Sequence, residues 1–512
     1  MKIVPSITSG MILVTAALFC GLLLVSIDAK FSIIRPFPDD YDETAYINQL
    51  CADRSIVMQQ GLVGFAKQLV SEDVIRPPGY RLAGFFVGLA SKPSPAILRS
   101  LSLLSLFVTA LVLFLTGKEI SGTNAGILWA SAFSFSTGAF WAALNFGTET
   151  MLYPALAGCL YGVARWLHKV RPDPTTIGVL ALSTALGSLS KVTFFSVFVP
   201  LIGAAVLLAP ETDERRRSLL AILGAVAGGT LVTIPWWLAN WQDALWFAKW
   251  SRQSFSSDLP WLTEAATELL GVPFTVGFLI FLGWILVRAN SLWKIPNRTT
   301  SNFIVVCLTG CLPLVVLHTL SDNHIMRLLT PALIPSIGVV VVLLDLGNLL
   351  KQRFVSAFIA SLFVIQAGNI AWQIPLWVLQ DPGGATWDWG QLRALARAYR
   401  LPNPTIFLLG YAREFTQPQI EYPWICHGEA VFVQLFKDPI DWSKVTNQID
   451  EADIVVTAPA FMFISSLDGQ NNDELAQRLH ERSDVWTPIK LYLRRNSTTP
   501  ILVFFRNLKR SQ

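Results

Sequence analysis

The sequence predicts a polytopic α-helical membrane protein with a small α/β domain at its C-terminal end. Its 512 residues are 53% hydrophobic and only 14% charged, whereas soluble domains are about 25% charged. Apolar runs close to the ~20 residues that cross a bilayer recur from residue 11 to residue 376. After residue 378, short strand-like runs take their place. Together these observations exclude a chain built only of ordinary soluble domains.

About eleven apolar runs have the length of a membrane span. We expect spans at residues 11–27, 97–116, 125–144, 150–167, 175–190, 192–209, 217–238, 270–288, 303–320, 327–348 and 354–376. We interpret the first run as an uncleaved anchor, with a cleaved signal peptide as the alternative. Phe19 is too large to precede a lipoprotein cleavage at Cys20.

The orientation follows from the basic residues of the short loops, which stay on the cytoplasmic side. One set of alternate loops is rich in Lys and Arg, at positions 118, 165, 169, 171, 215–217, 288, 294, 298, 351 and 353. The other set holds only Lys191, Lys249 and Arg252. We therefore predict an inner-membrane protein with its N-terminus inside and its C-terminus outside.

The chain divides into two predicted domains. Residues 1–378 form the membrane domain, whose first outer loop covers residues 28–96. Residues 379–512 form an outer α/β domain, with strand-like runs at 405–410, 430–436, 453–458, 489–494 and 501–506 and a helical pattern at 472–482.

Two aromatic or amphipathic stretches on the outer side are expected at the membrane surface. "GLVGFAKQLVSEDV", residues 61–74, places its apolar residues on one helical stripe. "PWWLANWQDALWFAKW", residues 235–250, is typical of an interfacial tryptophan belt. The alternative for the second stretch is a stacking surface for a sugar ring or a prenyl chain.

The first outer loop opens with an acidic stretch, "PDDYDETAYINQL", residues 38–50. Asp40 and Glu43 fit a capping box at the start of a helix. That structural interpretation leaves Asp42 without a role, and Asp42 and Tyr46 are four residues apart on one helical face. A carboxylate at this position could take a proton from an attacking hydroxyl group if the leaving group is already activated.

A lipid phosphate is such a leaving group, and it needs cations around it. The outer side offers Arg76 in "VIRPPGYRL", Lys191 in "SLSKVTFF" and Arg327 in "SDNHIMRLLTPALIP". The alternative for each is a side chain that reaches toward lipid headgroups. Glu149, at the outer start of the fourth span, is either a helix cap or a second acidic group facing the same cavity.

Metal and nucleotide chemistry find little support. His318 and His324 lie at one outer mouth without further metal ligands, so we expect no zinc site there. The sequence leaves dependence on a divalent metal open. The sequence contains no phosphate-binding glycine loop, and we predict no cofactor and no nucleic-acid partner. Cys51 and Cys426 could pair in an oxidising compartment, but we interpret them as two isolated thiols. The other four cysteines lie in or beside predicted spans.

Several of these stretches, taken in order, resemble the membrane glycosyltransferases of the GT-C class. The similar branch contains protein O-mannosyltransferases and bacterial transferases that add aminoarabinose to lipid A. Asp42, Glu43 and Tyr46 match its acidic-acidic-x-x-aromatic pattern, and Arg76 matches its basic residue before proline. Further matches, in the family's order, are "TET" with Glu149, "LSKVTFFSVFVPL" with Lys191, "IPWWLANW", and "HIMRLLTPALIP" with His324 and Arg327.

The resemblance implies a polyprenyl-phosphate sugar donor, an acceptor hydroxyl or amine on a glycan, lipid or protein, and inverting transfer at the outer membrane surface. Asp42 and Glu43 would then be catalytic. The donor-binding residues would be Tyr46, Arg76, Glu149, Lys191, His324 and Arg327. Two other classes remain as alternatives: a secondary transporter of an envelope precursor, and a non-catalytic membrane scaffold. A transporter should carry polar groups at the bilayer midplane, whereas the ionisable groups here cluster at the predicted outer mouths.

Overall fold

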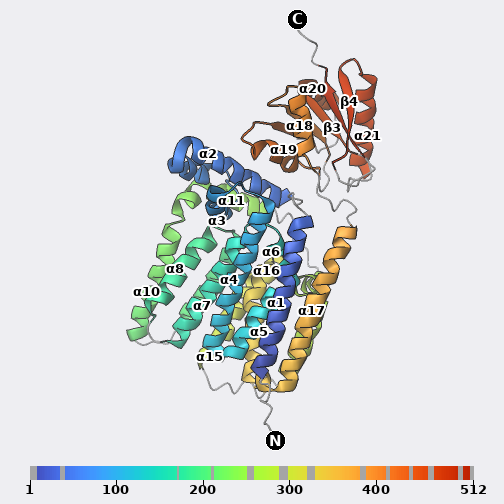
Figure 1. Cartoon of the computed structure of the whole chain (residues 1–512). Coiled ribbons are helices and arrows are strands. Elements are labelled where there is room, and N and C mark those ends of the chain that lie inside the picture. The colour runs from blue at the N-terminus through green and yellow to red at the C-terminus, as the bar shows by residue number, and fades with distance from the viewer. Residues whose placement is uncertain are drawn as a thin grey trace. The chain divides into compact units, whose positions relative to one another are not determined.

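The computed structural model describes residues 9–34, 41–169, 172–208, 213–250, 259–287, 298–319, 329–380, 388–410, 415–436, 442–458, 466–493 and 500–507 (Figure 1). The chain forms two compact units. The first, here called the helical unit, consists of Met1–Lys30, Ala66–Ala83 and Arg99–Leu376. The second, here called the α/β unit, consists of Phe31–Phe65, Gly84–Leu98 and Trp377–Gln512.

Helices account for nearly all of the described chain up to Gln380. They are α1 (Ser9–Ile34), α2 (Tyr41–Ser71), α3 (Gly79–Ala90), α4 (Pro95–Ser121), α5 (Thr123–Ser134), α6 (Thr137–Leu144), α7 (Glu149–His168), α8 (Pro174–Ser188), α9 (Thr193–Leu207), α10 (Asp213–Leu231), α11 (Ile234–Trp250), α12 (Leu259–Leu270), α13 (Val272–Val287), α15 (Arg298–Thr319), α16 (Thr330–Leu346), the short 3-10 helix η2 (Leu349–Lys351) and α17 (Arg353–Gln380). Each predicted span overlaps one or two of them, because an apolar segment in lipid must satisfy its backbone hydrogen bonds internally.

Several helices are long and apolar enough to cross a membrane. By length and composition, the described residues contain four such helices, Ser9–Phe31, Pro95–Ser121, Arg298–Thr319 and Arg353–Gln373. Three bent helix pairs raise the number to as many as seven, with bends of 59° between α5 and α6, 73° between α10 and α11, and 112° between α12 and α13. The chain is thus an integral membrane protein by these helices, while the count of about eleven and the orientation stay predictions.

One buried amide holds two of these bends. The Nε2 atom of Gln366, on α17, lies 3.1 Å from the Phe135 carbonyl and 3.1 Å from Thr137 Oγ1 at the α5–α6 break. The same atom lies 3.0 Å from the Leu270 carbonyl at the α12–α13 break. Gly271 follows with a φ of 85°, where a Cβ atom would lie 2.3 Å from Gln366 Nε2. A broken helix leaves carbonyls without partners, and Gln366 supplies one for both breaks.

The C-terminal part of the α/β unit is the predicted small α/β domain (Figure 1). Its five strands are β1 (Thr405–Leu409), β2 (Phe432–Phe436), β3 (Ile454–Thr457), β4 (Trp486–Leu491) and β5 (Ile501–Arg506), in the order β2-β1-β3-β5-β4. β1 pairs in parallel with β2 and β3, and β5 runs antiparallel to β3 and β4. All five strand-like runs of the sequence become strands, so the predicted fold class is confirmed.

Two helices cover each face of the sheet. Ile406 and Leu408 of β1 join one core with α18 (Gly390–Ala398) and α19 (Gln417–Ile425). Phe407 and Leu409 alternate to the other core, with α20 (Trp442–Glu451) and α21 (Ser466–Glu481). A strand that is apolar on both faces is typical of a sheet covered on both sides, and "TIFLL" is such a strand.

A disulfide within the α/β unit corrects one expectation. The sequence favoured isolated thiols, but Cys51 on α2 is bonded to Cys426 at the end of α19, with 4.9 Å between the Cα atoms. The two residues are 375 positions apart, so no local sequence pattern could predict the disulfide. The first part of α2 therefore belongs to the same unit as the C-terminal domain.

Candidate functional site

The acidic stretch becomes the first turns of α2. The helix begins at Tyr41, and Asp42 and Glu43 lie in its first turn, where the positive end of a helix favours carboxylates. Glu43 is buried with 1% of its surface exposed, while Asp42 is half-buried. Tyr46 is buried one turn further on. Of the two carboxylates, Asp42 is the more accessible to a substrate; Asp40, the proposed cap, lies outside the described residues.

A third carboxylate lies on the same stripe of α2 and was not singled out from the sequence. Asp53 follows Asp42 by eleven residues and Tyr46 by seven, so the three lie within about 40° of one another around the helix. Asp53 is 1% exposed. The spacing 42, 46, 53 was the signal that could have found it.

Arg76 lies in a loop that Asp73 organises. Asp73 Oδ1 accepts a hydrogen bond from the Arg76 backbone N–H at 3.1 Å, and its Oδ2 accepts one from the Tyr80 hydroxyl at 2.9 Å. The guanidinium of Arg76 lies 4.0 Å from the same carboxylate and is 24% exposed. Burial raises the pKa of Asp73, and the positive charge of Arg76 opposes that rise. The sequence analysis did not single out Asp73, although its i, i+3 spacing to Arg76 is a signal for such a contact.

The Arg76 loop is fastened to the turn that carries Lys191. The Gly79 N–H donates to the Leu189 carbonyl at 2.5 Å, and a Cβ atom at Gly79 would lie only 2.5 Å from that oxygen. Only glycine permits this approach. The structure therefore brings the segments of two predicted cations, Arg76 and Lys191, to neighbouring positions in the helical unit.

Lys191 and Glu149, both predicted site residues, form an ion pair. Lys191 Nζ lies 2.7 Å from Glu149 Oε1, and the side chains are 21% and 12% exposed. The Thr148 hydroxyl donates to Glu149 Oε2 at 3.2 Å. Glu149 is the first residue of α7, so its charge also lies at the positive end of that helix. The pair joins the start of α7 to the α8–α9 turn.

The tryptophan segment of α11 packs against the same turn. Trp237 Nε1 donates to the Ser188 carbonyl at 3.1 Å, and its ring makes an edge contact with Phe195. Asn240 Nδ2 donates to the Val70 carbonyl at 2.7 Å, which ties α11 to the end of α2. Trp241 and Trp246 are 49% and 62% exposed, as an interfacial belt requires. Part of the segment is thus structural, and the belt itself stays a prediction.

Two predicted donor-binding residues, His324 and Arg327, lie outside the described residues. Asp42, Glu43 and Tyr46 belong to the α/β unit, whereas Arg76, Glu149 and Lys191 belong to the helical unit. The direct contact among these residues for which the structure gives a distance is the Lys191–Glu149 pair.

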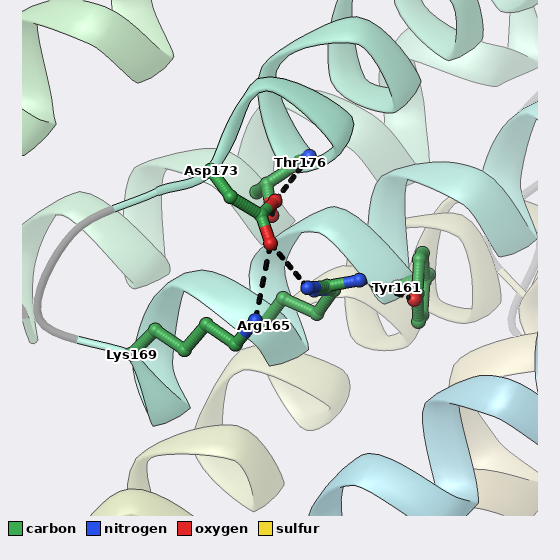
Figure 2. Close-up of polar contacts among 5 residues, drawn as sticks. All are labelled: Tyr161, Arg165, Lys169, Asp173 and Thr176. Carbon is green, nitrogen blue, oxygen red and sulfur yellow. Dashed lines mark hydrogen bonds and ion pairs between the residues drawn. The ribbon is translucent and has the colours of Figure 1, made fainter.

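A second polar cluster, between α7 and α8, has a structural role (Figure 2). Asp173 caps α8 by accepting hydrogen bonds from the Thr176 N–H at 2.8 Å and the Thr176 hydroxyl at 2.7 Å. Its other oxygen binds Lys169 Nζ at 3.1 Å and the guanidinium of Arg165, which also donates to the Tyr161 hydroxyl at 2.8 Å. The hydrogen bonds from Thr176 hold the pKa of Asp173 well below its usual range. Two basic residues of a predicted cytoplasmic loop are thereby committed to a helix cap.

Comparison with known proteins shows which family and which fold the chain resembles. Residues 77–238 match the family model described as dolichyl-phosphate-mannose-protein mannosyltransferase. The ArnT crystal structure from Cupriavidus metallidurans bound to undecaprenyl phosphate superposes with a TM-score of 0.60, covering 96% of this chain and 97% of that chain at 12% identity. The chain has the fold of ArnT. Apo ArnT from the same organism gives a TM-score of 0.62 at 11% identity, with 94% and 97% coverage.

The ArnT-like fold confirms the resemblance to the GT-C class that the motifs indicated. The family match runs from the residue after Arg76, through Glu149 and Lys191, to Leu238 in the tryptophan segment. The apo oligosaccharyltransferase of Archaeoglobus fulgidus is a more distant match, with a TM-score of 0.46, 12% identity and coverage of 87% of this chain and 69% of that chain. Comparison with curated proteins found no match.

Proposed function

We propose that the protein transfers a sugar from a polyprenyl-phosphate donor to an acceptor hydroxyl or amine at the outer face of the inner membrane. The observation that carries this proposal is the ArnT-like fold over nearly the whole chain, with the mannosyltransferase family match across the segment that holds Glu149 and Lys191. Undecaprenyl phosphate, the lipid bound by that ArnT structure, is the carrier lipid that a donor of the class implied by the motifs would release on giving up its sugar.

The cations of the helical unit are suited to a lipid phosphate. Arg76 offers a two-pronged donor in a loop whose backbone is fixed by Asp73 and by two prolines. Lys191 offers a point charge that Glu149 holds in place. We assign donor binding to these residues together with Tyr46, His324 and Arg327.

Asp42 is the general base of the proposed reaction. It would take the proton of the acceptor while the acceptor oxygen or nitrogen bonds to the anomeric carbon, and the polyprenyl phosphate leaves in a single inverting displacement. Its half-buried position on the first turn of α2 supports this role over a purely structural one. Glu43, almost fully buried beside it, supports the site from within.

The outer location of the reaction is consistent with the disulfide. A bond between Cys51 and Cys426 persists in an oxidising compartment and not in the cytoplasm. It supports an extracytoplasmic location for both α2 and the C-terminal domain, which is also the side that the charge asymmetry of the loops predicts. The acceptor, whether glycan, lipid or protein, would be reached from there.

The test is transfer from a polyprenyl-phosphate sugar by the full-length protein in liposomes. Asp42→Asn should keep donor binding and melting temperature but slow transfer by about 10² to 10⁴, the usual contribution of a positioned base. The control is Asp473→Asn on the exposed side of α21, which should transfer like the parent. Full turnover by Asp42→Asn with a folded but inactive Glu43→Gln would move the base by one residue. Absence of transfer by the parent protein with every donor tried would favour a transporter or a scaffold.

A further inference from the structure

The first part of α2, which carries the acidic residues, is attached to the C-terminal domain by a disulfide and a hydrogen bond, and Ser55 lies close to the same domain. Cys51 is bonded to Cys426, and Asn48 Nδ2 donates to the Pro418 carbonyl at 2.8 Å. Ser55 Oγ lies 4.0 Å from the position of a Cβ atom at Gly428. Asn48, Cys51 and Ser55 are spaced three and four residues apart, so they form one stripe of the helix.

The partner surface is held firmly by the sheet. α19 turns Ile420 and Trp424 into the core beneath the sheet, and neither is exposed. Pro418 and Cys426, at its two ends, contact α2. Because one face of α19 is fixed in the core, its other face is a rigid support for whatever is bonded to it.

The acidic residues lie on the opposite stripe of α2. At about 100° per residue, Asp42 and Tyr46 lie between about 120° and 180° around the helix from Asn48, Cys51 and Ser55. The disulfide and the hydrogen bond to the C-terminal domain therefore lie on one face of α2, and Asp42 lies on the opposite face. The helix is interrupted at Gly61, where φ is 68°, so the stretch before it is a short helix whose orientation depends on its own contacts.

We propose that the C-terminal domain positions the acidic residues of α2, holding the helix through the Cys51–Cys426 disulfide and the Asn48–Pro418 hydrogen bond. Asn48, Cys51 and Cys426 are positioning residues in this assignment and touch no substrate. The effect on turnover rests on the proposed function, whereas the effect on the helix itself does not.

The first arm of the test measures the helix alone. Hydrogen–deuterium exchange of the full-length protein is followed over residues 41–60 for the parent, the reduced parent, Asn48→Ala and Cys51→Ser/Cys426→Ser. We expect about tenfold faster exchange when the disulfide is lost, while α19 stays protected by its core. Without the disulfide, α2 still packs against α3, because Leu50 lies beside Gly84 and the rings of Phe65 and Phe85 are stacked. We therefore expect the helix to become more mobile but to stay in place. Reductant should have no further effect on the double variant, because the other four cysteines are buried and unbonded.

Unchanged exchange over residues 41–60 after reduction would overturn the proposal. So would an equal increase over α7 and α8, because that would signify general unfolding. Cys51→Ser and Cys426→Ser should behave alike, since either change removes the same bond.

The second arm measures turnover in the same samples. Reduction and the double substitution should lower kcat about tenfold, leave the affinity for undecaprenyl phosphate unchanged, and reverse on reoxidation of the parent only. Faster exchange with undiminished kcat would overturn the positioning role. If the parent itself transfers no sugar, the proposed function fails, and the exchange experiment still decides whether the domain holds the helix.

Discussion

The Lys191–Glu149 pair gives the sharpest test of the site in the helical unit. In Glu149→Gln the shape of the side chain is kept, but Lys191 loses its counter-charge in a place where only 21% of its side chain is exposed. An uncompensated, mostly buried charge is costly because the protein cannot replace the water it has lost. We therefore expect a clear fall in the free energy of unfolding.

The expected size follows from the geometry. With the charged atoms 2.7 Å apart and the charge centres about 4 Å apart, an effective dielectric of about 20 gives about 4 kcal/mol of attraction. Removing one partner of a buried pair costs about 3 to 5 kcal/mol. Because Lys191 retains some solvent contact, we expect about 3 kcal/mol for Glu149→Gln. The double variant Glu149→Gln/Lys191→Met should recover most of this loss, since no charge is then unpaired.

The measurement is unfolding by SDS titration of the purified protein in lipid–detergent micelles, followed by tryptophan fluorescence. Glu474→Gln is the matched control, because Glu474 pairs with Arg478 at 2.6 Å but both side chains are 44% to 49% exposed. It should cost about 0.5 kcal/mol or less. A loss for Glu149→Gln no larger than that of the control would refute the reasoning that this pair is a buried one.

Three further predictions concern donor binding, pH and orientation. In a lipid-binding assay, Arg76→Lys should bind undecaprenyl phosphate more weakly than the parent, and Arg76→Ala more weakly still. The alanine variant should lose about 1.5 to 3 kcal/mol of binding free energy. If Arg76→Ala binds as tightly as the parent, the phosphate is assigned to Lys191 instead. Burial raises the pKa of Glu421 on α19 to about 7 from the ordinary 4.5. The folded protein therefore keeps a proton that the unfolded chain loses, so stability should fall as pH rises from about 4.5 to about 7, by up to about 3 kcal/mol. Glu421→Gln should flatten that dependence in thermal melts at pH 5 and pH 8, and an equally steep dependence in the variant would contradict the assignment. A reporter fused after Arg217 should read as cytoplasmic and one fused after Gln512 as external; signals from the same side would overturn the predicted topology.

Local patterns predicted the elements well, because they depend on neighbouring residues. The apolar runs became helices, and "TIFLL" and "ILVFFR" became central strands, since periodicity and burial are written in the residues themselves. The order of motifs along the chain also pointed to Glu149 and Lys191, which the structure joins. For these two residues, the sequence showed both the opposite charges and the position of each near the end of a predicted helix.

Long-range contacts could not be read in the same way. Cys51 and Cys426 were the two cysteines outside the predicted spans, yet spacing alone cannot decide whether thiols 375 residues apart meet. The roles of Asp73 and Gln366 likewise depend on which loops and helix breaks the fold brings beside them. Such residues look like ordinary polar positions until the partner is known.

The shared amide of Gln366 bears on how the helical unit can move. A break in a helix serves as a hinge only if its two arms can swing separately. Here the α5–α6 and α12–α13 breaks are both bonded to the side-chain nitrogen of Gln366, which is fully buried. A swing at either break would therefore pull this amide away from the other break and leave a buried carbonyl without its partner, which is costly. We therefore regard these two bends as a rigid frame. If the helical unit opens to admit a long lipid, we expect the movement in loops that are not hydrogen-bonded to Gln366.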